Sequence, residues 1–225
     1  MAGKISLARS VQLLAQVTDT GNAVDGGAGM GSTGKELISV VSPGRRVIAY
    51  EPFPGNHRFW NDMDHRIELR KTALGASYGE MTLRVSSAVS ADSDWGRKGR
   101  EGYSSLGFIT GGPPQGLFDT AVRVVRGDDD LSLDVPIGVV KLDLQGGEEA
   151  AITGMQSLFA DSVNLAWIEM LAASTALLQQ LEDFNFRVFD TEYLFKGEPT
   201  SESDRYFKPT GGTFKLSTDK VAWHG

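Results

Sequence analysis

The sequence predicts an α/β fold with a mostly parallel central sheet, flanking helices and an antiparallel hairpin at the C-terminal end. Strand and helix patterns alternate along most of the chain, which is typical of parallel sheets joined by right-handed crossovers. The segment 137–144 is nearly all apolar, as expected of a strand that is buried on both faces of such a sheet. The 225 residues show no internal repeat and no domain boundary, so we expect a single domain over 1–225.

In the first half of the chain, the spacing of apolar residues predicts helices and runs of β-branched residues predict strands. Apolar residues at helical spacing predict a helix at 5–17, within an N-terminal segment 1–20. The run RVIAY at 46–50 predicts a strand, and Asn56 is placed to cap a helix that ends near Asp64. The other elements expected here are strands at 22–25, 66–72 and 81–86 and a helix at 35–41.

The second half begins with a long glycine-rich stretch, 87–118, which contains seven glycines. A loop of this length in a compact domain is commonly a lid or a binding element. We therefore expect a substrate lid there, with Trp95 and Tyr103 as acceptor-binding side chains. The elements expected after it are strands at 121–125, 137–144, 164–169 and 186–189, helices at 148–159 and 174–183, and a last strand at either 213–216 or 221–223.

Composition excludes several classes of protein and of site. The chain has no cysteine, which excludes disulfides, thiolate nucleophiles and cysteine-ligated metal centres, and its three histidines do not suggest a metal site, so we expect no metal. The net charge of −7 is opposite in sign to that of a general nucleic-acid binder, so we expect no nucleic-acid partner. No apolar run approaches the ~20 residues that span a bilayer. We expect no signal peptide, no membrane insertion and a cytoplasmic location.

Glycines are dense between the first expected strand and the helix that follows it, over residues 26–34. Glycine there lets backbone N–H groups approach a ligand, and a helix N-terminus favours a negatively charged group. Three kinds of ligand loop use this device. In the first, residues 29–35 fit the phosphate loop G-x-x-x-x-G-K, but Glu36 stands where a hydroxyl residue should hold Mg²⁺.

The two other interpretations share an acidic residue at the end of the second strand. Residues 29–34 match the dinucleotide loop G-x-G-x-x-G. Residues 25–31 match D-x-G-x-G-x-G, in which the loop wraps the amino-acid part of S-adenosylmethionine and Asp25 receives its ammonium group. In both cases Glu51 can accept the two ribose hydroxyls with its two carboxylate oxygens. The spacing alone leaves both alternatives open.

Further motifs follow the glycine loop in a fixed order: VDGGAGMG at 24–31, AYEPFPGN at 49–56, ALG at 73–75, KLDLQGGE at 141–148 and IE at 168–169. This ordered set resembles the FkbM family of S-adenosylmethionine-dependent methyltransferases, over about residues 22–190. Two positions depart from the family pattern. Gly29 replaces the usual asparagine, and Gly147 replaces alanine or a larger residue.

The resemblance implies a Rossmann-like class I methyltransferase fold, with a central sheet of about seven strands and S-adenosylmethionine as cofactor. It implies O-methylation of a hydroxyl group on a small-molecule or glycan acceptor, either a sugar or a secondary metabolite. A P-loop-like or NAD-binding protein and a non-catalytic cofactor-binding member are the alternatives. The cofactor-binding residues that the resemblance implies are Asp25, Gly27, Ala28, Gly29, Gly31, Glu51, Pro52, Thr72, Ala73 and Asp143.

Lys141 and Asp143 lie in an otherwise apolar strand, and a buried charge needs a partner. Strand alternation places them on one side together with Gln145, where they can pair with each other or with Glu148. Asp143 also stands at the carboxyl end of its strand, where ligands bind in parallel sheets. The candidate catalytic residues are Asp143 as general base and Lys141 as its orienting partner, with Glu148 or a histidine as the alternative base. Glu169, which ends the next strand, is a candidate for binding the acceptor.

Overall fold

A computed structural model describes most of the chain. The described residues are 7–8, 11–12, 19–86, 107–108, 117–131, 135–169, 175–190 and 219–224. Residues 7–8 and 11–12 are helical, and the rest of the helix expected at 5–17 lies outside the described residues. Trp95 and Tyr103 also lie outside them.

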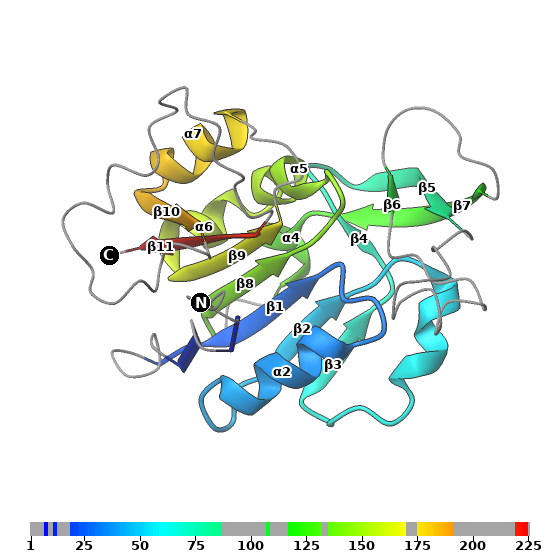
Figure 1. The fold of residues 1–225 in the computed structure, drawn as a ribbon, viewed down its shortest axis with the longest axis horizontal. Helices are drawn as coiled ribbons and strands as arrows, with labels where there is room; N and C mark the ends of the chain where they lie inside the picture. Colours follow the sequence, from blue (N-terminus) through cyan, green and yellow to red (C-terminus); the bar gives the residue numbers. More distant parts are fainter. Residues whose placement is uncertain are drawn as a thin grey trace, which may run out of the picture.

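The central sheet has seven strands in the order β10-β11-β9-β8-β1-β2-β3 (Figure 1). Their bounds are β1 Asn22–Gly26, β2 Val47–Tyr50, β3 Ile67–Arg70, β8 Ile137–Leu142, β9 Leu165–Glu169, β10 Phe186–Asp190 and β11 Asp219–His224. The neighbours from β3 to β9 pair in parallel, whereas β11 runs antiparallel to both β9 and β10. The expected parallel sheet with a C-terminal antiparallel hairpin is confirmed, and β11 contains the expected strand at 221–223. The alternative strand at 213–216 lies outside the described residues.

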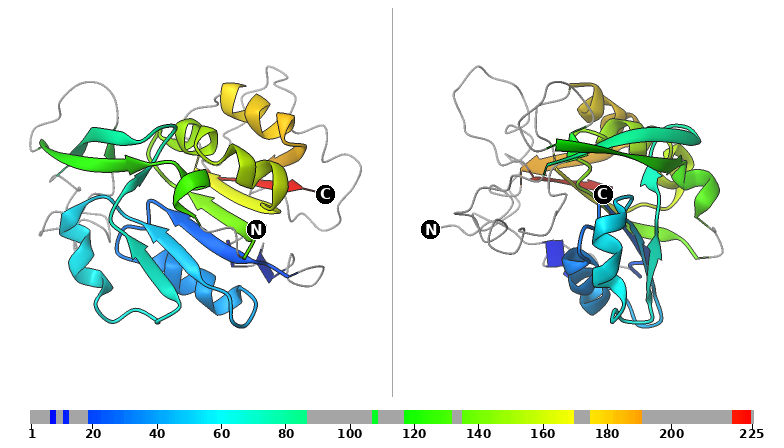
Figure 2. Two further views of the ribbon diagram at one scale, coloured as in Figure 1. Left: turned by 180° about the vertical axis from the view of Figure 1, so that it is seen from behind. Right: turned by 90° about the vertical axis from the view of Figure 1, so that its right-hand side faces the viewer.

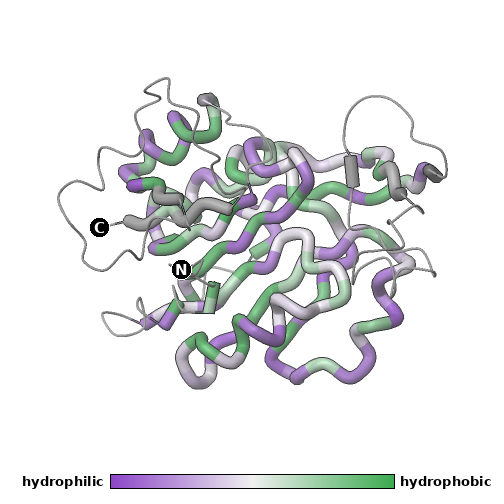
Figure 3. The backbone as a smooth tube through the Cα atoms, in the orientation of Figure 1, coloured by the Kyte–Doolittle hydropathy of each residue, from purple (hydrophilic) through white to green (hydrophobic). Residues whose placement is uncertain are grey.

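Helices pack on both faces of this sheet (Figure 2). They are α2 Ser32–Val40, the 3₁₀ helix η1 Pro54–Trp60, α4 Gly127–Asp130, α5 Glu148–Thr153, α6 Gln156–Asp161 and α7 Thr175–Asp183. Alternate strand residues separate into two buried clusters. Val24 belongs to a cluster with residues of α5, α6 and α7, while Ala23 belongs to a cluster with residues of α2 and η1. The central strands are accordingly rich in hydrophobic residues (Figure 3), as burial on both faces requires.

A second, smaller sheet follows β3 and was not anticipated as a separate unit. Its order is β4-β7-β5-β6, with β4 Ala73–Leu74, β5 Gly79–Ser86, β6 Gly107–Phe108 and β7 Leu117–Val125. β5 and β7 pair antiparallel from Gly79–Val124 to Ser86–Leu117. The expected loop at 87–118 is therefore too long at its C-terminal end and is interrupted by β6.

Two helices differ from their sequence-based bounds. Asn56 does not cap a helix over 56–64: η1 begins at Pro54 and ends at Trp60, and Asn56 lies buried inside it. The helix expected at 148–159 is broken into α5 and α6 at Gly154. A Cβ on Gly154 would lie 2.0 Å from the carbonyl oxygen of Gly75, so this close backbone contact admits only glycine.

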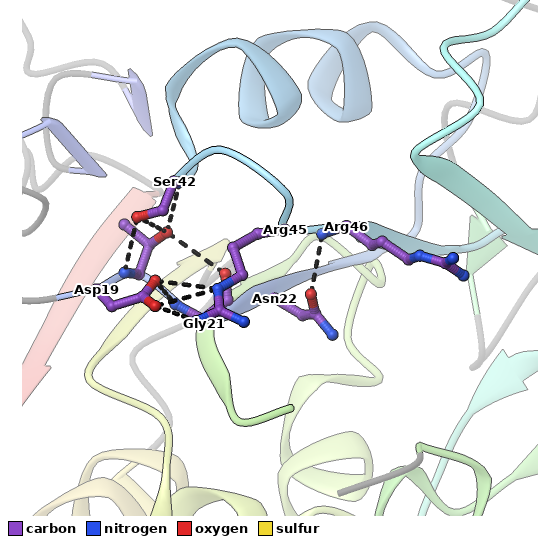
Figure 4. A network of polar contacts seen from close by, with 7 residues as sticks. Asp19, Gly21, Asn22, Ser42, Arg45 and Arg46 are labelled. Carbon is purple, nitrogen blue, oxygen red and sulfur yellow. Dashed lines mark hydrogen bonds and ion pairs between the residues drawn. The ribbon is translucent and has the colours of Figure 1, made fainter. Parts of the chain in front are cut away.

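Polar contacts fix the chain where it enters β1, at the end of the sheet away from the glycine loop (Figure 4). Arg45 forms an ion pair with Asp19, and its Nε donates to both carboxylate oxygens at 3.2 and 3.1 Å. The buried Thr20 hydroxyl accepts the Ser42 N–H at 2.9 Å. These contacts join the start of β1 to the turn between α2 and β2, which helps to set the register of the two strands.

Candidate active site

The carboxyl ends of four neighbouring parallel strands meet along one edge of the sheet. β1 ends at Gly26, β2 at Tyr50, β8 at Leu142 and β9 at Glu169. The sequence motifs follow these ends directly, so one edge gathers the glycine loop and the acidic residues that the sequence singled out. Ligands of open parallel sheets bind at this edge, on either side of the first strand.

The glycine loop turns tightly between β1 and α2. The N–H groups of Gly27 and Ala28 both donate to the Tyr50 carbonyl at 3.0 Å, and the Gly31 N–H donates to the Ala28 carbonyl at 2.9 Å. Gly27, Gly29 and Gly31 all have positive φ angles, of 70°, 55° and 84°. This is the left-handed region, which explains why glycine recurs at every second position.

The three glycines differ in what surrounds them. A Cβ on Gly27 would lie 1.9 Å from the Asp143 carbonyl oxygen, and one on Gly31 would lie 2.3 Å from the Met63 methyl group. A Cβ on Gly29 would meet nothing within 4 Å. Gly27 is thus demanded by a backbone contact, Gly31 is crowded by the end of a flexible methionine side chain, and Gly29 is the glycine at which this loop faces open space.

A buried ion pair lies directly beneath the loop. Lys141 Nζ is 3.1 Å from Asp25 Oδ1 and donates to the carbonyl oxygens of Gly26 at 3.0 Å and Gly27 at 2.9 Å. Asp25 is fully buried, and burial raises the pKa of its carboxyl against the opposing effect of Lys141. Lys141 Nζ lies 4.0 Å from Asp143 Oδ2. Two hydrogen bonds from Lys141 therefore hold the carbonyl groups at the start of the loop, and its ion-pair partner at the shortest distance is Asp25 rather than Asp143.

Glu51 faces the loop from the end of β2. Its Oε2 accepts the Gly29 N–H at 2.7 Å and its Oε1 accepts the Phe53 N–H at 2.8 Å. The residue is only 4% exposed. Burial raises the pKa of Glu51 to about 7, although these N–H groups and a hydrogen bond from Asn56 act in the opposite direction.

Carboxylates meet across the ends of β8 and β9. Gln145 Nε2 donates to Asp143 Oδ1 and to Glu169 Oε2, both at 2.6 Å. Gln145 has a φ of 55°, a left-handed conformation that is uncommon for a residue other than glycine. The Asp143 side chain is 42% exposed. This arrangement presents one accessible carboxylate whose orientation is fixed by a neighbouring amide.

Glu148 closes the turn that follows Asp143. Its Oε1 accepts the Leu144 N–H at 2.7 Å and its Oε2 accepts the Gly146 N–H at 3.0 Å. Burial raises the pKa of Glu148, and these backbone N–H groups lower it. Its carboxylate is thus engaged by the backbone of the 144–147 turn, ahead of the first turn of α5.

The remaining expected residues lie near the same edge. Pro52 follows Glu51 and is partly buried, and Ala73 begins β4, where it pairs with Val124. Seven buried side-chain polar atoms of the described residues have no hydrogen-bond partner, and Thr72 Oγ1, Asn56 Oδ1 and both carboxylate oxygens of Asp25 are among them. Such atoms are rare in folded proteins and mark places where a ligand or water completes the bonding.

Sequence reasoning did not select Trp60, Gln145 or Asn56 as site residues. Trp60 Nε1 donates to the Gly29 carbonyl at 2.9 Å, and Gln145 bridges the two carboxylates. The motifs AYEPFPGN and KLDLQGGE contain Asn56 and Gln145, so a signal existed for two of the three. No cluster of three or more metal-ligating side chains occurs in the part of the chain that the structure describes.

Comparisons with known proteins bear on the fold. No protein-family model matches the chain, and no curated protein matches it. Among solved structures, it is similar to an FkbM methyltransferase of Methylobacillus flagellatus, with a TM-score of 0.52 and 17% identity over 91% of this chain and 44% of that one. This chain thus spans less than half of the length of that protein. The expected class I methyltransferase fold is confirmed.

Two further solved structures have lower TM-scores. A precorrin-6y C5,15-methyltransferase of Geobacter metallireducens gives 0.46, with 15% identity over 100% of this chain and 93% of that one. A protein described as an rRNA methylase of Clostridium thermocellum gives 0.47, with 12% identity over 99% and 96%. Within the described residues, no helix has the length and apolar character needed to cross a bilayer.

Proposed function

We propose that this chain is an S-adenosylmethionine-dependent methyltransferase of the FkbM type that methylates a hydroxyl group of a sugar, glycan or secondary metabolite. The observation that carries the proposal is the pairing of Gly29, where the loop faces open space, with the buried carboxylate of Glu51 at the end of the neighbouring strand. An acidic residue at that place can bind a ribose, and a glycine loop beside it admits the rest of a nucleoside-linked ligand.

The residues present suit this cofactor. Glu51 would accept its ribose hydroxyls, the loop at 27–31 would line its amino-acid part, and Thr72 and Ala73 would border its adenine. The buried, unpartnered Thr72 Oγ1 and Asn56 Oδ1 supply free hydrogen-bonding capacity near these positions. When bound, S-adenosylmethionine supplies an electrophilic methyl group on a positively charged sulfur.

Asp143 is the group best placed to act as general base. A hydroxyl group is a poor nucleophile near neutral pH and gains from a carboxylate that accepts its proton as the new bond forms. Asp143 is accessible, and Gln145 fixes its orientation while linking it to Glu169. The other two candidates already bond to the backbone, because Lys141 donates to carbonyl groups at the start of the loop and Glu148 accepts N–H groups of the 144–147 turn. The acidic edge and the net charge of −7 favour an acceptor without phosphate charges.

The two nucleotide-binding alternatives fit less well. In the phosphate-loop interpretation Gly34 and Lys35 should end the loop, but α2 begins at Ser32, so both residues lie within the helix and Lys35 is exposed. The dinucleotide-binding sheet has the order 3-2-1-4-5-6. Here the antiparallel strand β11 is inserted between β9 and β10.

Thermal unfolding in the presence of three ligands tests the proposal. We expect S-adenosylhomocysteine at 100 times its dissociation constant to stabilise the protein by about 2.7 kcal/mol, because it binds only the folded state. NAD and ATP–Mg²⁺ should leave the unfolding temperature unchanged. A shift with ATP–Mg²⁺ or NAD alone would overturn the proposal, and a shift with S-adenosylhomocysteine without transfer to any hydroxyl acceptor would favour a non-catalytic binder.

The pKa of Glu51, raised to about 7, predicts that cofactor affinity depends on pH. Ribose hydroxyls donate to the ionised carboxylate, so binding favours the deprotonated form. We expect the affinity for S-adenosylhomocysteine to fall as the pH is lowered through 7, by up to about tenfold per unit below it. Calorimetric titrations between pH 5.5 and 8.5 measure this, and Glu51→Gln should bind weakly at every pH.

The same group predicts the pH dependence of stability without ligand. Between its ordinary pKa of 4.5 and about 7, Glu51 holds a proton in the folded state that it releases when the chain unfolds. The free energy of unfolding should therefore fall as the pH rises through this window. Glu51→Gln should lack this part of the decline. An identical pH profile in both proteins would contradict the assignment.

A further inference from the structure

The peptide groups on both sides of Gly29 are held by side chains from the segment that follows β2. Glu51 accepts the Gly29 N–H at 2.7 Å, and Trp60 donates its indole N–H to the Gly29 carbonyl at 2.9 Å. Gly29 is also the position at which the loop faces open space. These two side chains therefore hold both peptide groups of Gly29, at the point where the Cβ direction of the loop is clear.

Trp60 is built rigidly into the protein. It is the last residue of η1, it is 8% exposed, and it packs in the cluster that contains Leu37 of α2 and Val47 of β2. Its ring also backs the loop at the next glycine, since a Cβ on Gly31 would lie 3.4 Å from the ring. Trp60 thus contacts the loop from the protein side at two consecutive glycines, while the Gly29 Cβ direction stays clear.

We propose that Trp60 is a positioning residue for the cofactor loop, which holds the Gly29 carbonyl so that the loop keeps its ligand-ready shape before a ligand arrives. This inference rests on the function proposed above. Under the proposed function the Glu51 carboxylate is shared between the Gly29 N–H and the ribose hydroxyls. The indole N–H of Trp60 has no role assigned toward the ligand and donates to the Gly29 carbonyl. Fixing a loop in its bound conformation lowers the ordering cost of binding.

Trp60→Phe tests the role, because it keeps a packed aromatic ring and removes the N–H donor. Loss of one hydrogen bond of ordinary strength corresponds to about two- to tenfold in affinity. We expect the dissociation constant of S-adenosylhomocysteine, measured by calorimetry, to rise by that factor. The matched control is Trp167→Phe in β9, which removes a second buried tryptophan from the same cluster. It should lower the unfolding temperature comparably and leave the dissociation constant unchanged.

Amide hydrogen exchange of the wild-type protein supplies a measurement that does not depend on a variant. The hydrogen-bonded amides of Ala28, Gly29 and Gly31 should exchange slowly without ligand, and Trp60→Phe should speed their exchange. Rapid exchange in the ligand-free wild type, or wild-type affinity in Trp60→Phe, would overturn the inference while leaving the methyltransferase proposal intact. Failure of the wild type itself to bind S-adenosylhomocysteine would overturn the proposed function, and this inference with it.

Discussion

Lys141→Met is expected to lower the free energy of unfolding by about 3–5 kcal/mol. The substitution leaves Asp25, which is fully buried, without its positive partner. It also removes the donor that the carbonyl groups of Gly26 and Gly27 share. A loss of this size is a large part of the stability of an ordinary domain. Urea unfolding followed by circular dichroism measures it.

The cost of Lys141→Met should grow with pH. Burial already raises the pKa of Asp25, and removal of Lys141 takes away the group that opposes this rise. The folded variant then binds a proton more strongly than the unfolded chain does, so its stability falls as the pH increases. The destabilisation measured at pH 8 should exceed that at pH 5.

Two control variants distinguish the loss of stability that is due to the broken ion pair from a general effect of removing a lysine. Lys35→Met changes an exposed lysine of α2 and should alter stability by about 0.5 kcal/mol or less. The double variant Asp25→Asn, Lys141→Met removes both buried charges and should recover part of the loss. A loss below about 1 kcal/mol at pH 8 would show that Asp25 finds another compensation.

The partner of Lys141 illustrates what the sequence could not provide. Its position in an apolar strand showed that the charge needs compensation, but alternation along one strand can only suggest neighbours such as Asp143. The partner comes from β1, which pairs with β8 in the register Asp25–Lys141. The register between strands that are distant in sequence depends on the whole sheet. A local pattern therefore shows that a buried charge needs a partner, and only the tertiary structure shows which residue that partner is.

The elements of the fold also differ in whether they could be predicted: those set by the local sequence were predicted, and those set by contacts between distant residues were not. The strands of the central sheet were predictable, because burial on both faces leaves apolar, β-branched runs in the sequence. The small sheet was missed because β5 and β7 pair across a long intervening stretch. The break between α5 and α6 at Gly154 was missed because the reason for glycine there, a close contact with the backbone of Gly75, comes from a residue far away in sequence.

Some positions of the candidate site could be predicted from the sequence. They are the loop glycines, which need a left-handed backbone, and the acidic residues that directly follow a strand. The sequence placed Glu51 and Asp143 just after strands, and the structure has them directly after β2 and β8; their roles toward a ligand stay predictions. The support for these residues was not predictable, because it comes from side chains that meet only in the folded protein. Trp60 at the loop apex and Gln145 between two carboxylates are both of this kind.

Gly27→Ala should be the most damaging change in the loop, with a loss of about 3 kcal/mol or more in the free energy of unfolding. The left-handed φ of 70° alone costs alanine about 1–2 kcal/mol. The added methyl group would also lie 1.9 Å from the Asp143 carbonyl oxygen, and neither atom belongs to a side chain that can turn away. Relief requires the loop to move off β8, which breaks the bond from the Asp143 N–H to the Gly26 carbonyl.

Gly29→Asn is the matched control, because it tests the same loop at a position with the same backbone region and free space. Asparagine tolerates a φ near 55°, and its Cβ would meet nothing within 4 Å. We expect a change of about 1 kcal/mol or less in stability, and retained binding of S-adenosylhomocysteine, since asparagine is usual here in the family that the chain resembles. Equal losses in the two variants would mean that the loop tolerates no side chain at all. A larger loss in Gly27→Ala would mean that Gly27 is required by the contact between the end of β1 and the end of β8, and that Gly29 can be replaced without loss of the fold.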